Sequence, residues 1–341
     1  MDDNEFLFTS RRAFLCKTGL LTGGLFLEAA KLKQSLFPNN AASSQELPCR
    51  ILGKTQVPLT TLSLDTTPCG CATNISSGQI AHIVNEALNQ GINCIDTART
   101  SGNAEEGIGM ALGRRRCDVF LSTKVWADTV ADAERSLSTS LRTLRTDYVD
   151  LLYFQNLGTL NFEKATASDG VFTWLVAQKQ SGKTRFIGIS GHNLSERFPD
   201  FITTGQLDAI MMVLNFVDRY IYAFEDKILP LARSYDLGIV AMKVFGGIRG
   251  GFRRYSGPKA PPQLPEEYLQ LAMRYALNLP GVTTANIGMH NVDQVCRNVA
   301  MARNIKPLTI EEQNKLENLG RQLAQHWRPH FGPIFSTSKT I

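Results

Sequence analysis

Short apolar runs alternate with amphipathic segments along most of this chain. Eight runs have the apolar, β-branched character of buried strands, and they span residues 59–64, 93–96, 119–125, 148–154, 186–190, 209–215, 238–243 and 283–287. Segments with a helical period of apolar positions follow them, at residues 78–89, 104–112, 131–144, 171–180, 196–203, 224–235, 266–278 and 292–303. This alternation predicts parallel strands joined by helices. Eight such repeats predict a single-domain (β/α)8 TIM barrel, a fold of about 250 residues.

The predicted barrel also indicates where chemistry should be sought. No G-x-G-x-x-G motif follows the first apolar run, which argues against an open dinucleotide-binding sheet. In (β/α)8 barrels the functional side chains lie at the C-terminal ends of the strands. The polar residues and glycines expected at those ends are Asp96, Lys124, Gln155, Ser190, Asn215, Lys243 and Gly288. A further helix at residues 310–325 and an aromatic tail complete the chain.

The N-terminal segment differs from the rest. Arg11 and Arg12 precede Phe14 and Leu15, and a mild apolar stretch follows at residues 18–27. This order is typical of a twin-arginine (Tat) signal, so we expect residues 1–42 to be a signal peptide and linker, and residues 43–341 the barrel. The apolar stretch is shorter than the roughly 20 residues of a permanent membrane anchor. The protein is therefore expected to use the twin-arginine export machinery and to be periplasmic. An ordinary signal peptide or a frayed amphipathic helix is the alternative.

The composition and charge argue against few classes of function. The chain is 43% apolar with a net charge of +5, and no long run of one sign indicates a nucleic-acid partner. No metal site is predicted. His192, just after the fifth predicted strand, is expected to be a solvated loop histidine, with a position at the barrel mouth as the alternative.

Asp96 and Lys124 are the strongest catalytic candidates. They end the second and third predicted strands, so both side chains should reach the barrel mouth. A buried charge is costly without a partner, which predicts an ion pair between the two. A purely structural pair that closes the top of the barrel is the alternative.

The surrounding motif resembles a known family. The pattern Asp96-Thr97-Ala98-x-x-x-Gly102-x-x-Glu105-x-x-Ile108-Gly109 is similar to the signature of the aldo-keto reductases, and the resemblance extends over roughly residues 50 to 325. The resemblance implies a catalytic set of four residues: an Asp, a Tyr, a Lys and a His. Asp96 and Lys124 match. Ser101 stands where the resemblance implies the Tyr, and Gln155 where it implies the His.

The resemblance also implies NAD or NADP as cofactor, with a preference that is not readable here. The implied cofactor-binding positions are Ser190, Asn215, Met242, Gly246, Gly247, Arg249, Gly288, Gln294 and Asn298. Paired glycines and arginines after the seventh strand, from Phe245 to Arg254, are expected to present backbone N–H groups to a phosphate. A flexible exposed loop is the alternative.

These residues favour an oxidoreductase that reduces a small carbonyl compound, or oxidises an alcohol, with an altered proton donor. Ser101 is shorter and less acidic than a tyrosine, and Gln155 cannot exchange a proton at neutral pH. Lys124 is one group that could act as the acid instead, directly or through a water. A catalytically inactive nucleotide- or ligand-binding protein is the alternative function, and a barrel that binds neither is the third.

Overall fold

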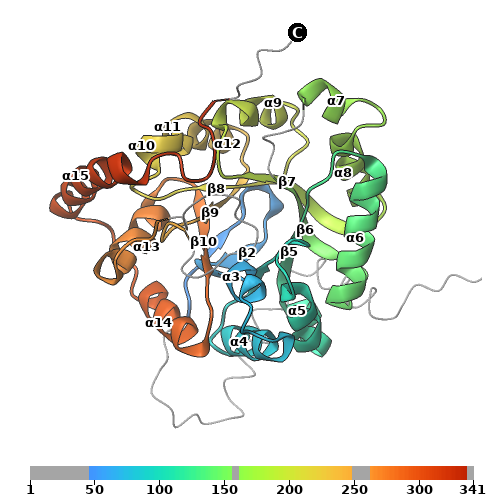
Figure 1. The fold of residues 1–341 in the computed structure, drawn as a ribbon, viewed down its shortest axis with the longest axis horizontal. Helices are drawn as coiled ribbons and strands as arrows, with labels where there is room; N and C mark the ends of the chain where they lie inside the picture. The colour runs from blue at the N-terminus through green and yellow to red at the C-terminus, as the bar shows by residue number, and fades with distance from the viewer. Residues whose placement is uncertain (1–45, 156–160, 248–261, 336–341) are drawn as a thin grey trace, which may run out of the picture. The chain divides into compact units, whose positions relative to one another are not determined.

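A computed structural model describes residues 46–155, 161–247 and 262–335, which belong to one compact unit. Within that unit eight parallel strands form a closed barrel, and helices surround it (Figure 1). The predicted fold is confirmed. The predicted signal segment, residues 1–42, and Arg249 lie outside the described residues. None of the helices described is long and apolar enough to cross a membrane.

The barrel strands follow one another around the barrel in chain order, and the last strand pairs with the first. They are β3 (Leu62–Asp65), β4 (Cys94–Asp96), β5 (Phe120–Val125), β6 (Val149–Gln155), β7 (Thr184–Gly191), β8 (Ala209–Val213), β9 (Gly238–Met242) and β10 (Val282–Gly288). Nearly every residue of these strands is buried, because helices cover the outside and side chains fill the inside. All eight C-terminal ends therefore open at one face.

Helices follow the strands as the periodicity predicts. The outer helices are α4 (Ser77–Asn89), α5 (Ala104–Leu112), α6 (Val130–Leu144), α8 (Val171–Gln180), α9 (Phe198–Thr203), α11 (Phe224–Lys227), α12 (Leu229–Ser234), α13 (Leu269–Asn278) and α14 (Val292–Arg303). The helix expected over residues 224–235 is divided at Ile228 into α11 and α12. Pro230 in the first turn of α12 explains the break, since proline cannot donate the backbone hydrogen bond that a continuous helix requires.

The first predicted strand is also two elements. Residues 58–60 form β2 (Pro58–Thr60), which pairs antiparallel with β1 (Cys49–Ile51), and the chain enters the barrel only at Leu62. Arg50 on β1 donates hydrogen bonds to the carbonyls of Leu277 (2.6 Å) and Val282 (2.7 Å). Because Val282 begins β10, this hairpin lies at the N-terminal end of the barrel, opposite the predicted site.

Three short helices in the connecting loops escaped prediction: α3 (Thr67–Cys71), α7 (Phe162–Thr166) and α10 (Arg219–Tyr222). After them, α15 (Ile310–Trp327) leads to a tail that crosses the C-terminal face. Phe331 of that tail lies 5.4 Å from the His192 ring, centroid to centroid, and Asn193 donates to the Pro333 carbonyl at 3.1 Å. The tail therefore forms part of the barrel mouth.

Candidate active site

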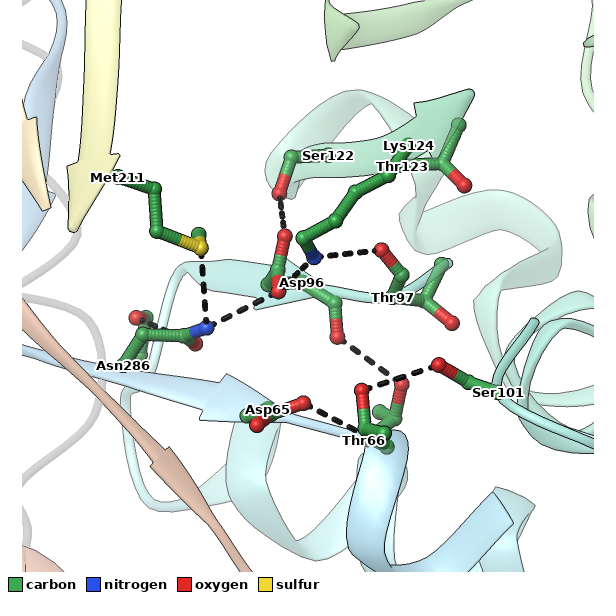
Figure 2. Close-up of polar contacts among 12 residues, drawn as sticks. Asp65, Thr66, Asp96, Thr97, Ser101, Ser122, Thr123, Lys124, Met211 and Asn286 are labelled. Atoms are coloured by element: carbon green, nitrogen blue, oxygen red, sulfur yellow. Dashed lines mark hydrogen bonds and ion pairs between the residues drawn. The ribbon is translucent and has the colours of Figure 1, made fainter. Parts of the chain in front are cut away.

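Asp96 and Lys124 meet at the end of the barrel where the predicted chemistry belongs. Both side chains are buried, with Asp96 2% and Lys124 7% exposed, and they form an ion pair. The Lys124 ammonium also donates to the Thr97 carbonyl at 2.8 Å. Figure 2 shows the lysine reaching from β5 across the end of β4 to both groups. The predicted pair is confirmed, and two of the three ammonium protons are used, one by Asp96 and one by the Thr97 carbonyl.

The remaining oxygen contacts of Asp96 tie it to the neighbouring strands. Ser122 donates to Oδ1 at 2.6 Å, and Asn286 of β10 donates to Oδ2 at 2.9 Å. Ser63 in turn lies 3.1 Å from the Asn286 amide oxygen. Burial raises the pKa of Asp96, and the Lys124 charge opposes that rise. Lys124 is therefore the main group that favours the ionised form of this buried carboxylate.

Ser101 lies near the pair without joining it. It is buried in the segment between β4 and α5, and its hydroxyl is 3.0 Å from that of Thr67 on α3. The backbone here is closely packed: a Cβ on Gly70 would come within 2.2 Å of the Ser101 carbonyl oxygen. In the described parts of the chain no hydrogen bond links Ser101 to Asp96 or Lys124. The structure thus separates Ser101 from the Asp96–Lys124 pair with which it was predicted to act.

Gln155 is at the end of β6, in register with Ser190 on β7. Its amide oxygen is buried, and none of the described residues donates a hydrogen bond to it. A buried acceptor without a partner costs free energy unless a ligand or water supplies a donor. Gln155 therefore presents an open acceptor near the mouth of the barrel.

A pocket with about 800 Å³ of empty space, open to solvent, lies beside the pair, at the ends of β9, β10 and β3. Five of the predicted cofactor positions line it: Gly246, Gly247, Gly288, Gln294 and Asn298. Asn286 lines it as well and donates to Asp96, so the pocket wall touches the buried pair. Ser190, Asn215 and Met242 are buried close to the strand ends but do not line the pocket.

Glycine is required at two points of the pocket wall. Gly246 has a φ of +83°, and a Cβ there would come within 2.7 Å of both the Pro262 carbonyl oxygen and Trp327. A Cβ on Gly288 would come within 2.3 Å of the Pro68 ring. The structure describes only residues 245–247 of the loop that was expected to bind an anion, and residues 248–254 lie outside the described residues. In the described part, the Gly246 and Gly247 N–H groups donate to the Lys243 and Pro262 carbonyls at 2.8 and 2.7 Å. These glycines shape the pocket and do not offer free donors.

Asn215 has a structural role in this arrangement. Its amide donates to Asp218 at 2.6 Å and to the Lys243 carbonyl at 3.0 Å, and its oxygen accepts the backbone N–H groups of Val217 and Asp218. The bond to Lys243 joins the loop after β8 to the loop after β9, and the bonds to Val217 and Asp218 fix the conformation of the loop after β8 itself. Asn215 therefore positions the pocket rather than lining it.

Three polar residues near the site were not among the predicted catalytic or cofactor-binding residues. Asp65, at the end of β3, and Lys243, directly after β9, both line the pocket. His192 was expected to be solvated, and that prediction is wrong, because its ring is half-buried under Phe331. Burial and the charges of Lys243 and Lys124 hold the pKa of His192 well below its usual value. Position at a strand end was the one available signal for Asp65 and Lys243.

Comparisons with known proteins agree with this geometry. The model of the family described as "Aldo/keto reductase family" matches residues 66–267, more than half of the chain. The uncharacterized oxidoreductase YqkF of Bacillus subtilis is 26% identical over 277 residues, covering 70% of this chain and 87% of that protein. L-galactose dehydrogenase of Arabidopsis thaliana is 25% identical over 303 residues, covering 79% and 92%.

A solved structure supports the fold. An aldo-keto reductase from Klebsiella pneumoniae, in complex with NADPH, superposes with a TM-score of 0.63 at 21% identity, over 79% of this chain and 94% of that one. The eight-stranded barrel, the ion pair at its C-terminal face and the family match over residues 66–267 lead to one assignment. The chain belongs to the aldo/keto reductase family.

Proposed function

We propose that the protein is an exported oxidoreductase that reduces a small carbonyl compound, or oxidises the corresponding alcohol, with NAD(P)(H) and with an altered proton donor. The observation that carries this proposal is the hydrogen bond from Asn286 to Asp96 at 2.9 Å. Asn286 lines the pocket and donates to Asp96, so the same side chain contacts both the pocket and the buried pair. Binding and chemistry can then take place in adjoining parts of one site.

The residues present fit a nicotinamide dinucleotide. Asn298 is buried at the pocket wall, and its amide oxygen accepts no hydrogen bond from any described residue, so a ligand donor would satisfy it. Gly288 and Gly246 keep the wall free of side chains. The Klebsiella pneumoniae relative in the fold comparison holds NADPH, which supports the same ligand class. When bound, the reduced cofactor supplies a hydride equivalent.

The residues of the chain supply orientation and charge. Lys124 places a positive charge at the mouth, where it stabilises negative charge on a substrate oxygen. Gln155 has an amide group that can donate a hydrogen bond to that oxygen, although it cannot transfer a proton. Ser101 bonds to Thr67 and makes no described bond to Lys124. We therefore propose that the proton comes from a group other than the residue at position 101.

Dinucleotide binding is the first test. We expect the full chain to bind NADPH or NADH saturably when cofactor fluorescence is titrated. Gly288→Ala should weaken binding at least tenfold, because the new Cβ would meet Pro68 in the pocket wall at 2.3 Å. Gly78→Ala is the matched control, since a Cβ there meets only the Ser76 hydroxyl at 3.9 Å. Absence of saturable binding in a folded sample, or equal affinity in both variants, would contradict the proposal.

Export is a separate part of the proposal and rests on Arg11 and Arg12 ahead of the apolar stretch. Replacing both arginines with lysines keeps the charge but removes the pair that the twin-arginine route recognises. We expect the variant to remain in the cytoplasmic fraction of a bacterial host while the unaltered chain is found in the periplasm, as measured by immunoblotting of cell fractions. Equal periplasmic amounts would argue for an ordinary signal or none.

A further inference from the structure

Lys243 has an unusual backbone conformation at the edge of the pocket. Its φ is +57°, in the left-handed region that residues with a Cβ rarely adopt. Two hydrogen bonds to its carbonyl hold this conformation, from the Asn215 amide at 3.0 Å and from the Gly246 N–H at 2.8 Å. A strained backbone conformation of this kind persists only where the surrounding structure fixes it, and such conformations cluster at functional sites. Lys243 lines the pocket from this fixed position.

The neighbours of the Lys243 ammonium are the groups of the candidate active site. Asp65 of β3, Asp96 of β4 and Lys124 of β5 all act on it electrostatically. Cys71 of α3 acts on it as well, and Lys243 in turn acts on His192 beyond β7. Lys243 therefore lies within the electrostatic field of the groups at the mouth of the barrel.

Lys243 and Lys124 differ in how their protons are used. The Lys124 ammonium is bound to Asp96 and to the Thr97 carbonyl. Within the ranges that the structure describes, the Lys243 ammonium makes no hydrogen bond or ion pair. A lysine that is held in place by its backbone, with unused donors facing a pocket, is available to a ligand.

We infer that Lys243 is the proton donor of this enzyme, a role that rests on the proposed function. As a hydride equivalent from the reduced cofactor adds to the carbonyl carbon, the C=O π electrons pass to the oxygen. That oxygen takes a proton from the Lys243 ammonium, which becomes a neutral amine. Solvent returns the proton after the alcohol leaves. Lys124 keeps its contacts with Asp96 and the Thr97 carbonyl throughout.

The electrostatics of the pocket agree with this assignment. Burial lowers the pKa of Lys243, and the positive charge of Lys124 lowers it further, while Asp65 and Asp96 act in the opposite direction. An amine whose pKa is below that of an ordinary lysine releases a proton more readily near neutral pH. Burial holds the pKa of His192 well below its usual value, so His192 is neutral and is a poor competitor as the acid.

The kinetic test compares Lys243→Met and Lys243→Arg with Lys183→Met, a lysine on the outer surface paired with Glu134. We expect Lys243→Met to lower kcat for carbonyl reduction, measured at saturating dinucleotide, about 100-fold or more, in the range of general acid catalysis. Lys243→Arg should also be slow, since a guanidinium does not release its proton. Lys183→Met should match the unaltered enzyme.

The pH dependence gives a sharper criterion. Reduction requires the charged form of Lys243, so kcat should fall as the pH rises through its pKa. Asp65→Asn removes a charge that raises this pKa and should move the alkaline fall to lower pH. A Lys243→Met enzyme that retains full turnover overturns the inference alone. Absence of turnover in the unaltered enzyme, with every carbonyl tested, overturns the proposed function together with it.

A second measurement needs no cofactor and no substrate. The cofactor-free full chain is treated with acetic anhydride across a pH series, and labelling of each lysine is measured by peptide mass spectrometry relative to its own plateau. Lys243 should reach half of its plateau at lower pH than Lys183, because only the neutral amine reacts. The difference should increase in Asp65→Asn. Identical pH dependence for Lys243 and Lys183 would overturn the inference.

Discussion

Replacing Lys124 with Met is expected to lower kcat/KM for carbonyl reduction about 1000-fold or more. The substitution removes the positive charge that stabilises a developing oxyanion, and losing one such group typically costs about 100- to 1000-fold. It also leaves Asp96 buried without its cation, so the carboxyl takes up a proton and the charge pattern of the site is lost. Steady-state kinetics with the cofactor at saturation measures the effect.

Stability provides the control for this experiment. Removing one partner of a buried ion pair typically costs about 3–5 kcal/mol of unfolding free energy. A double variant, Asp96→Asn with Lys124→Met, removes both charges and should recover part of that loss in urea unfolding without recovering turnover. Lys183→Met should change neither property. Unchanged turnover in Lys124→Met would show that the pair only closes the top of the barrel, and it would contradict the assignment of the active site.

The fold was readable because its signals are local. Apolar strand runs and helix-period segments repeat along the chain, and α5, α8 and α14 begin and end at the predicted residues. The deviations also have local causes. Pro230 divides α11 from α12, and pairing with β1 draws residues 58–60 out of the barrel strand. A pattern of buried positions cannot tell such a hairpin from the strand that follows it.

Only part of the site could be predicted from the sequence, because the rest depends on contacts between segments that are far apart in the chain. Asp96 and Lys124 stand at strand ends, and barrel geometry alone predicts that they meet. The left-handed conformation of Lys243 depends on Asn215, 28 residues earlier in the chain. The burial of His192 depends on Phe331 of the C-terminal tail. No periodicity or spacing in the sequence indicates either contact.

The second large expected effect is on stability and concerns Asp218, which faces His330 of the same tail. This carboxyl is buried at the start of α10, where one oxygen accepts a hydrogen bond from Asn215 at 2.6 Å. The other oxygen has no hydrogen bond from any described residue and faces Nε2 of His330 at 3.6 Å. Burial raises the pKa of Asp218 to about 7, and burial also lowers the pKa of His330. The folded protein therefore favours an uncharged Asp218.

Asp218→Asn is accordingly expected to stabilise the protein at alkaline pH. An unfolded aspartate has a pKa of about 3.9, so above that pH the unfolded state loses a proton that the folded state retains up to about pH 7. The unfolding free energy must then fall as the pH rises between these two values. At about 1.4 kcal/mol per pKa unit, the unfolding free energy decreases by at most about 4 kcal/mol. The whole of this decrease has taken place by pH 8.

Asparagine has nearly the shape of the neutral aspartic acid, and its oxygen can still accept the Asn215 hydrogen bond. We therefore expect urea unfolding of Asp218→Asn to show a gain of several kcal/mol at pH 8, within the limit of about 4 kcal/mol, and none at pH 4. Asp226→Asn, at an exposed position on α11, is the matched control and should show no such dependence. A gain of equal size at both pH values would mean that the substitution acts through packing. No gain at pH 8 would mean that His330 takes up a proton and neutralises Asp218, which would make the tail contact an ion pair.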